Sequence, residues 1–316
     1  MALSAATTAR AQTARIELHI FDSVTLTDQQ FLAGTKDGNA VQVAGELRLA
    51  PGTERAPAVV LIHQCSGIGA NVERWAEVLN GIGVGVFLVD SFTSRGIVET
   101  CTDQTRLGNL GMIIDAYRAL DLLAKHPRVD ASRIAIMGFS KGAFAALYSS
   151  LKRFQRMYGT DGIEFAAYLP FYGRCETRYI DDEKVAAKPI RLFHGEDDDY
   201  IPIAPCRAYV ERLRKKGVDI LLTAYPNARH SFDNPLYPAL RTLPDAEVST
   251  RCRREERQNG VIFNLDTNRP YSQKDACVTR GASIGFNAEA QSAAVMAVTA
   301  FLTDTFHLST SIPTIR

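Results

Sequence analysis

Apolar residues along the chain form short continuous runs, and several of the stretches between them repeat apolar residues at helical spacing. Continuous runs are typical of strands buried on both faces, and helical spacing is typical of helices that cover a sheet. The predicted buried strands lie at residues 59–62, 84–89, 133–137, 165–172, 190–194 and 220–225. The predicted helices lie at 72–79, 111–123, 205–216 and 288–306, and an alanine-rich helix follows residue 142. This alternation predicts an α/β fold with a mostly parallel sheet and helices on both faces.

The N-terminal part of the chain has a different pattern. Residues 16–20 and 41–49 alternate between apolar and polar, as half-buried antiparallel strands do. In open α/β sheets, ligands bind beyond the carboxyl ends of the strands. The residues just after each predicted strand are therefore the place to search for chemistry.

Composition and charge narrow the class of protein. The chain has 316 residues, of which 46% are hydrophobic, enough for one large domain or two ordinary ones. Its 36 basic and 35 acidic residues give a net charge of +1. That balance predicts no nucleic-acid partner and no anionic membrane partner. The longest apolar run, near residues 58–62, is far too short to span a bilayer, so we expect a soluble protein.

The N-terminus and the cysteines bear on localisation. Within the small, neutral residues 1–12, Ala9-Arg10-Ala11 resembles the end of a secretory signal whose basic and apolar parts are missing. Residues 1–14 are therefore interpreted as a signal-peptide remnant or, alternatively, a disordered N-terminus. The six cysteines allow full pairing in an oxidising compartment, and none forms a C-x-x-C pair typical of zinc or redox sites. We predict a periplasmic or secreted protein, with the cytoplasm as the alternative.

A candidate nucleophile lies in Gly138-Phe139-Ser140-Lys141-Gly142, a G-x-S-x-G sequence between a predicted strand and a predicted helix. That context is the one a nucleophile elbow requires. The serine sits on a sharp turn, where side chains two residues before and after it would collide with the crossing strand and helix. Glycine at both positions removes those side chains. The alternative is a strand-to-helix turn with a capping serine.

An acid and a histidine follow two later strands. The turn after residues 190–194 holds Asp197, Asp198 and Asp199, and His230 comes shortly after residues 220–225. The spacing G-x-x-D-x-x-x-P favours Asp198, with Asp199 second and Asp197 third. Serine, acid and histidine in this chain order are typical of α/β-hydrolases. The sequence therefore predicts Ser140, Asp198 and His230 as a catalytic triad, although each alone is also compatible with an ordinary loop residue.

An oxyanion hole needs two backbone N–H groups that point at the developing negative charge. We assign one to Lys141, directly after the nucleophile, and the other to Cys65, in the loop after the 59–62 strand. In the same loop, His63 is interpreted as a brace. Cys65 is expected to contribute its backbone or a disulfide and no side-chain chemistry.

With these motifs in place, the chain resembles the dienelactone hydrolase family of α/β-hydrolases from Ala56 to Leu302. The matching segments are 58–67, 89–96, 138–142, 195–202 and 225–232. The resemblance implies an α/β-hydrolase fold in a single domain, at residues 15–310. It also implies a hydrolase that cleaves a small ester or lactone.

The departures from the family pattern are informative. Ser140 stands where the enzyme that names the family has a cysteine nucleophile, and Gln64 stands where that enzyme has a glutamate that gates the cysteine. Of its two arginines that hold a substrate carboxylate, one matches Arg95 and the other falls at Asn234. The retained parts imply serine ester hydrolysis. Gln64 and Arg95 are candidate substrate-binding residues, and a structural ion pair is the alternative for Arg95.

Residues 234–285 are longer than the family core needs between its last strand and last helix. A connection of this length is usually functional or tied down. We interpret it as a lid or rim insertion stapled by a Cys252–Cys277 disulfide. Cys175 and Cys206 both follow strand ends close to the acid turn, and Cys65 and Cys101 both flank the presumed site, so we expect these as the other two pairs.

These inferences combine into a Ser-His-Asp hydrolase that acts on a carboxylic ester or lactone through an acyl-enzyme. The mechanism calls for no metal and no organic cofactor. Activity should fall in acid as the histidine protonates. The alternatives are acyl transfer or peptide cleavage on the same triad, and a non-catalytic binding protein with this fold, against which an intact triad argues.

Overall fold

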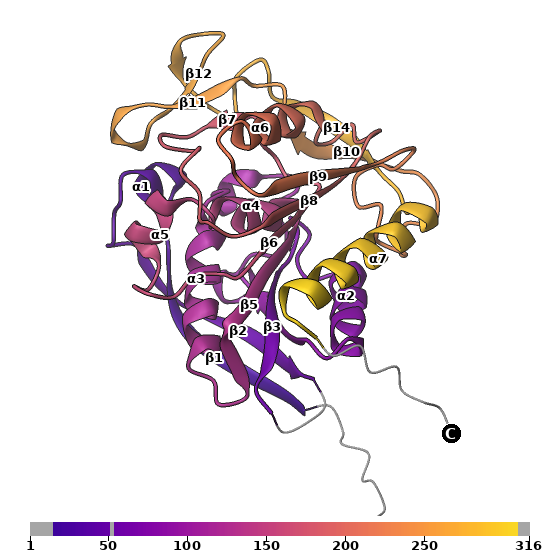
Figure 1. The fold of residues 1–316 in the computed structure, drawn as a ribbon. Helices are drawn as coiled ribbons and strands as arrows, with labels where there is room; N and C mark the ends of the chain where they lie inside the picture. The colour runs from indigo at the N-terminus through magenta and orange to yellow at the C-terminus, as the bar shows by residue number, and fades with distance from the viewer. Residues whose placement is uncertain (1–14, 51–53, 309–316) are drawn as a thin grey trace, which may run out of the picture.

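The computed structural model describes residues 15–50 and 54–308, and its centre is a twisted sheet of eight strands (Figure 1). The strand order across the sheet is β1-β2-β4-β3-β5-β6-β8-β9. The six strands β4, β3, β5, β6, β8 and β9 are parallel to one another. At one edge, β2 is antiparallel to β4 and β1 is antiparallel to β2. Their bounds are β1 (Arg15–Thr25), β2 (Asn39–Leu49), β3 (Ala56–Ile62), β4 (Gly85–Asp90), β5 (Val129–Phe139), β6 (Tyr168–Phe171), β8 (Ile190–Gly195) and β9 (Ile220–Tyr225). The interpretation of residues 1–14 lies outside the described residues.

Helices cover both faces of the sheet, as the sequence predicts. One face carries α2 (Ala70–Gly81) and α7 (Ala288–Thr305), and the other carries α3 (Gly111–Ala124), α4 (Lys141–Tyr148) and α6 (Ala204–Arg214). The sequence patterns did not predict the short helices, which are α1 (Asp28–Leu32), α5 (Lys152–Tyr158) and the 3-10 turns η1 (Thr93–Arg95), η2 (Gln104–Arg106) and η3 (Gln258–Gly260). Among the described residues, no helix is long and apolar enough to cross a membrane.

The two faces explain why the central strands read as continuous apolar runs. In β3, Val60 and Ile62 pack into the apolar cluster under α3 and α4, whereas Val59 and Leu61 pack into the cluster under α2 and α7. All four side chains are fully buried. Successive residues of a strand point to opposite faces, so a strand that is covered twice needs apolar residues at every position.

Residues 234–285 form strands where the sequence suggested only a long connection. β10 (Arg241–Val248) pairs with β14 (Thr279–Ile284), and β11 (Arg254–Glu256), β12 (Ile262–Asn264) and β13 (Arg269–Pro270) form a small sheet with β7 (Thr177–Arg178). These strands lie at the end of the molecule toward which the parallel strands run (Figure 1). They are two to eight residues long and carry many polar residues, so no apolar pattern marks them.

Three disulfides tie this end of the molecule together: Cys65–Cys101, Cys175–Cys206 and Cys252–Cys277. They are the three pairs expected from the sequence. The last one joins two points within the insertion. Three disulfides are consistent with an extracellular or periplasmic protein.

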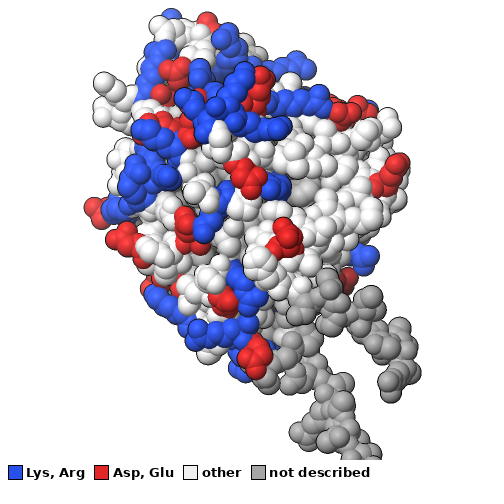
Figure 2. Space-filling model, viewed as in Figure 1, with Lys and Arg blue, Asp and Glu red and all other residues white. Residues whose placement is uncertain are grey.

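Lys and Arg gather over the end of the molecule that holds α6 and β11, with Asp and Glu among them (Figure 2). On α6, Arg212 pairs with Asp182 at 2.8 Å and Arg207 pairs with Glu196. Acidic partners therefore offset part of this positive charge.

Candidate active site

Ser140 lies on the sharp turn between β5 and α4. Its backbone has φ 50° and ψ −109°, a conformation that L-residues rarely adopt. The neighbouring glycines permit this turn. A Cβ on Gly138 would lie 2.1 Å from the Gly142 carbonyl oxygen, and a Cβ on Gly142 would lie 2.3 Å from the Ile62 carbonyl oxygen. The turn therefore has the geometry of a nucleophile elbow.

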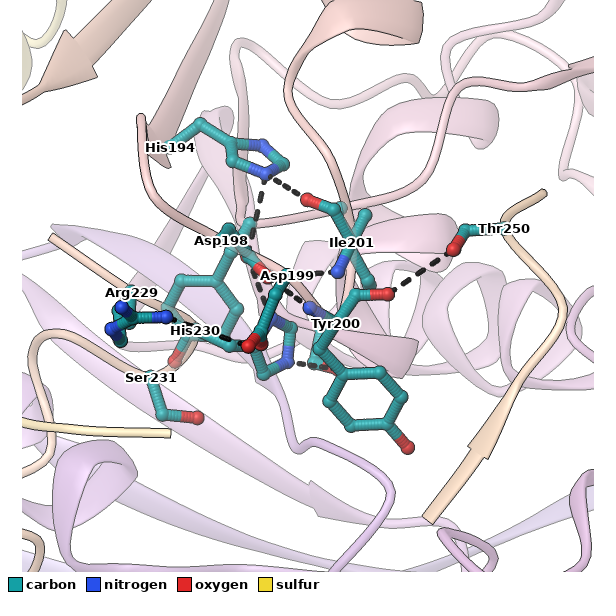
Figure 3. Close-up of polar contacts among 12 residues, drawn as sticks. His194, Asp198, Asp199, Tyr200, Ile201, Arg229, His230, Ser231 and Thr250 are labelled. Atoms are coloured by element: carbon teal, nitrogen blue, oxygen red, sulfur yellow. Dashed lines mark hydrogen bonds and ion pairs between the residues drawn. The ribbon is translucent and has the colours of Figure 1, made fainter. Parts of the chain in front are cut away.

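The structure brings Ser140, His230 and Asp198 together, and Figure 3 shows His230 beside Asp198. The Ser140 hydroxyl lies 2.9 Å from His230 Nε2, to which it can donate, and His230 Nδ1–H donates to Asp198 Oδ2 at 2.8 Å. Asp198 follows β8 and His230 follows β9, so both reach the carboxyl end of the sheet where β5 delivers the serine. All three residues are buried. This arrangement can pass a proton from the hydroxyl to the imidazole.

Asp198 is held in one orientation by a shell of donors. The backbone N–H groups of Tyr200 and Ile201 donate to its Oδ1 at 3.0 and 2.7 Å. His194 Nε2 donates to the Ile201 carbonyl at 2.7 Å and lies 3.4 Å from Asp198 Oδ2. Burial alone would raise the pKa of Asp198, but the charge of His230 and the hydrogen bonds from both histidines outweigh it, so its pKa lies well below the usual range. Asp198 therefore stays ionised opposite His230.

The neighbouring residues Asp197 and Asp199 do not contact the His230 ring. Asp199 Oδ1 accepts from the Ser283 N–H at 2.9 Å, and its Oδ2 accepts from the Ser283 hydroxyl at 2.6 Å. Asp199 also lies 3.4 Å from Arg229, and thus joins the turn to β14. Asp197 is exposed. Only the Asp198 side chain contacts the histidine, in agreement with the spacing argument.

Two tyrosines enclose the His230 ring, and the sequence patterns did not single them out. The ring centroids of Tyr172 and Tyr200 lie 4.7 and 4.9 Å from that of His230. The Tyr172 hydroxyl donates to Asp233 Oδ1 at 2.8 Å, and Trp75 Nε1 donates to Asp233 Oδ2 at 2.7 Å. Burial raises the pKa of Asp233. An aromatic residue directly after β6 was the available clue, but its partners come from distant segments.

The backbone N–H groups assigned to the oxyanion flank the serine. Lys141 is the first residue of α4, so its N–H has no partner earlier in the helix. Cys65 lies in the loop after β3, which the disulfide to Cys101 and the Thr100 N–H, donating to the Cys65 carbonyl at 2.8 Å, hold in place. Cys65, Ser140 and Lys141 all line one small cavity. The Lys141 side chain turns away and donates to the Leu107 carbonyl at 2.6 Å, and burial lowers its pKa to about 8.

His63 braces the loop that carries Cys65. Its Nδ1–H donates to the Gln64 carbonyl at 2.8 Å, and its Nε2 accepts from the Ser91 N–H at 3.2 Å. The two contacts assign the tautomer. The ring is fully buried, and this burial lowers the pKa of His63. A neutral imidazole thus joins the loops after β3 and β4.

Two cavities meet at Ser140. The larger, of about 390 Å³, opens to solvent between the serine and the insertion. Its lining includes His230, Gln64, Tyr237, Leu243 and Ile284. The smaller, of about 20 Å³, shares Cys65, Ser140 and Tyr200 with the larger one and is also lined by Lys141. A substrate bound at the serine therefore has two directions in which to extend.

The two candidate substrate-binding residues differ in outcome. Gln64 lines the larger cavity, and its Nε2 donates to the Ser66 hydroxyl at 3.0 Å. The structure contradicts the expectation that Arg95 binds substrate. Its guanidinium donates to both oxygens of Asp115 at 2.8 and 2.9 Å, and the Arg95 and Asp115 side chains are 4% and 0% exposed. An arginine committed to a buried carboxylate cannot hold a substrate, so the structural alternative is the right one.

One group of described residues has the composition of a metal site, and it lies away from the serine. Glu17, His19 and His126 have ligand atoms within 4.8 Å of one another. The two imidazoles hydrogen-bond to Glu17 Oε2 at 3.1 Å each. His126 comes just before β5 begins, whereas Ser140 follows its end, so the group lies at the opposite end of that strand. It plays no part in the site around the serine.

Comparisons with known proteins identify the family of the chain. The model of the "Dienelactone hydrolase family" matches residues 45–262. Among curated proteins, the chain is 25% identical over 217 residues to "Acylamino-acid-releasing enzyme 1" of Oryza sativa subsp. japonica, a match that covers 57% of this chain but only 28% of that protein. It is 24% identical over 207 residues to "Probable 2-oxo-3-(5-oxofuran-2-ylidene)propanoate lactonase" of Bradyrhizobium sp, covering 60% of this chain and 79% of that protein.

Among solved structures, the fold is similar to that of a dienelactone hydrolase-like promiscuous phosphotriesterase from metagenomic libraries. The TM-score is 0.55 at 18% identity, and the match covers 91% of this chain and 98% of that chain. At that identity the similarity concerns the fold, which is the α/β-hydrolase type. The family match extends from the end of β2 to the start of β12 and includes the turns that carry the serine, the acid and the histidine. The chain belongs to the dienelactone hydrolase family.

Proposed function

We propose that the protein is a serine hydrolase that cleaves a carboxylic ester or a lactone through an acyl-enzyme. The observation that carries the proposal is the continuous hydrogen-bond chain from Ser140 through His230 to Asp198, on a turn whose strain projects the serine hydroxyl. In the proposed reaction, His230 Nε2 takes the hydroxyl proton as Oγ attacks the carbonyl carbon. Asp198 stabilises the imidazolium that forms.

The remaining steps use groups already described. The N–H groups of Lys141 and Cys65 would donate to the oxyanion of the tetrahedral intermediate. His230 then passes its proton to the leaving oxygen, and the carbon–oxygen bond to the alcohol breaks. A water molecule, deprotonated by His230, attacks the acyl-enzyme and releases the acid, which restores the Ser140 hydroxyl. In a lactone, the leaving oxygen stays attached to the acid.

A serine-directed phosphonate tests the nucleophile, and a panel of aryl esters and lactones tests the reaction. We expect a single covalent adduct at Ser140 by mass spectrometry and hydrolysis of at least one ester or lactone class. The curated lactonase relative supports including lactones in the panel. A protein that forms no adduct and hydrolyses no member of the panel would instead be a binding protein with this fold.

Peptide-bond cleavage on the same residues is the second candidate, because one curated relative is named an acylamino-acid-releasing enzyme. Matched substrates separate the two candidates: an N-acetylamino-acid aryl ester and the corresponding aryl amide share the acyl group and differ only in the leaving atom. We expect the ester to react far faster. Comparable values of kcat/KM for both would favour the peptidase.

A further inference from the structure

The smaller cavity beside Ser140 contains a buried carboxylate without a partner. Glu247, on β10 of the insertion, is 6% exposed, and its Oε1 is buried with no hydrogen-bond partner. Among residues 15–50 and 54–308, no donor is bonded to this oxygen. The backbone of Glu247 is held at both ends of the residue. Its N–H donates to the Cys101 carbonyl at 2.9 Å, and its carbonyl accepts from Gln104 Nε2 at 3.1 Å. A carboxylate is thus held at the cavity wall with one buried acceptor unused.

The cationic side chains around this cavity already have acceptors. Arg174 donates to Glu176 at 2.7 Å, to Ser249 at 2.9 Å and to Gln104 at 3.3 Å. Lys141 Nζ donates to the Leu107 carbonyl. What the cavity lacks is therefore a hydrogen-bond donor for Glu247, since a buried acceptor without one is costly.

Charge and size restrict what the donor can be. Arg174 and Lys141 both line the cavity, so a third positive charge would be repelled there. A cavity of about 20 Å³ admits only a small group such as a hydroxyl. Because the Cys65 and Lys141 N–H groups beside Ser140 are assigned to the oxyanion, that group lies beyond them, toward Glu247. A neutral hydroxyl satisfies both conditions.

The two cavities also determine which part of a substrate carries that hydroxyl. His230 lines the larger cavity and is absent from the lining of the smaller one. Because His230 must protonate the leaving oxygen, the alcohol leaves on the side of the larger cavity. The acyl group then extends toward Lys141 and the smaller cavity, which begins at Ser140 itself.

We propose that the smaller cavity is a subsite for a hydroxyl group on the acyl part of the substrate, close to the reacting carbonyl, and that Glu247 accepts its hydrogen bond. This inference rests on the proposed ester or lactone hydrolysis. It makes short hydroxyacyl esters and hydroxylactones the preferred substrate class. A site that hydrogen-bonds a substrate hydroxyl discriminates against the analogue that lacks it, because the buried acceptor is then left unpaired.

The test compares ethyl glycolate with ethyl propionate, which have the same alcohol and differ by a hydroxyl in place of a methyl group. Acid release in a pH-stat gives kcat/KM for each, and the ratio is divided by the ratio of their alkaline hydrolysis rates to remove intrinsic reactivity. In the wild-type protein we expect a corrected preference for glycolate of about tenfold or more. A corrected ratio near one would overturn the subsite.

Three variants locate the preference. Glu247→Met keeps the volume and removes both acceptors, so the corrected ratio should fall about tenfold. Glu247→Gln keeps one acceptor and should retain part of the preference. Glu255→Gln, on β11 of the same insertion, is the matched control and should keep the wild-type ratio. Circular dichroism melting curves establish that each variant is folded.

The outcomes separate the two proposals. If the wild-type preference exists but survives in Glu247→Met, the hydroxyl is recognised elsewhere and the role of Glu247 is wrong. If Glu247→Met does not fold, Glu247→Gln decides: a wild-type preference that this variant retains in full overturns the role of Glu247. If the wild-type protein hydrolyses neither ester and none of the aryl esters and lactones, the failure belongs to the proposed function.

Discussion

The turns after β5, β8 and β9 and the insertion at residues 234–285 meet at the same cavity but are built differently. Each turn follows a parallel strand of the central sheet, and each places one member of the Ser140–His230–Asp198 chain. The insertion consists of short antiparallel strands closed by the Cys252–Cys277 disulfide, and it supplies cavity-lining residues such as Leu243 and Glu247. The proposed chemistry therefore depends on the sheet, whereas the shape of the cavity depends on the insertion.

The two regions also differ in how their geometry is set. A turn after a parallel strand inherits its position from the hydrogen bonds of the whole sheet. In the insertion, the pairing of β10 with β14 shifts register between Leu243 and Glu247. Such irregularities re-aim the side chains beside them. Substitutions at the strand ends should therefore change the rate of reaction, and substitutions in the insertion should change stability or substrate preference.

The largest effect is expected at the serine. Ser140→Ala removes the nucleophile without adding bulk to the strained turn, so kcat should fall by about 10⁵-fold to 10⁶-fold with little change in Tm. Steady-state hydrolysis of an aryl ester measures the fall. Ser132→Ala, on the exposed start of β5, is the matched control and should retain activity. Substantial activity in Ser140→Ala would contradict the proposed nucleophile.

The next effect separates the adjacent aspartates. Asp198→Asn removes the charge that stabilises the imidazolium and alters the tautomer of His230, so kcat should fall by about 10³-fold to 10⁴-fold. Asp197→Asn, whose side chain is exposed, should remain close to wild type. Kinetics on one aryl ester for both variants decide the matter, and an equal loss in the two would place the acid elsewhere.

A stability effect is expected where the sequence suggested substrate binding. Arg95→Met leaves Asp115 as a buried, unpaired charge and should lower the free energy of unfolding by about 3–5 kcal/mol. Urea denaturation measures it. Below the midpoint of unfolding, KM for esters with an anionic acyl group should match the wild-type value. A raised KM specific to anionic esters would restore Arg95 as a substrate ligand.

The disulfides distinguish the two regions directly. Replacing Cys252 and Cys277 together with serine opens a loop of 25 residues and should lower the free energy of unfolding by about 3 kcal/mol, with the activity loss mainly in KM. Replacing Cys65 and Cys101 releases the loop that carries a proposed oxyanion donor and should lower kcat. If replacing either cysteine pair lowered kcat equally, the insertion would contribute directly to the catalytic step.

The smallest effect concerns acid stability. The pKa of Asp198 is held below the value of an unfolded aspartate, so the unfolded chain binds more protons at this site as the pH falls. Its contribution to stability is present above about pH 4 and is lost as the pH falls toward the pKa in the folded protein. Urea denaturation between pH 5 and pH 3 should therefore show a steeper loss of stability for wild type than for Asp198→Asn. Parallel curves would argue against an ionised Asp198.

The sequence predicted the positions of Ser140, Asp198 and His230 better than the contacts around them. The G-x-S-x-G turn and the spacing of the acid are local patterns, because a sharp turn restricts the residues that form it. Arg95 shows the converse. Its motif matched a substrate ligand of the family, but Asp115 on α3 lies close enough to bind it, and nothing near Arg95 in the sequence reveals that partner. Tyr172 and Asp233 escaped notice for the same reason.

The doubly covered parallel sheet, the order of serine, acid and histidine at its edge, and the number of cysteines available for pairing can all be read from the sequence. Apolar periodicity and turn chemistry act over a few neighbouring residues, so the sequence displays them directly. The pairing of β10 with β14, the partner of Arg95 and the position of Glu247 beside Ser140 become visible only in the folded chain. Those contacts join segments tens of residues apart, and the free energy that selects them comes from packing and register across the whole fold.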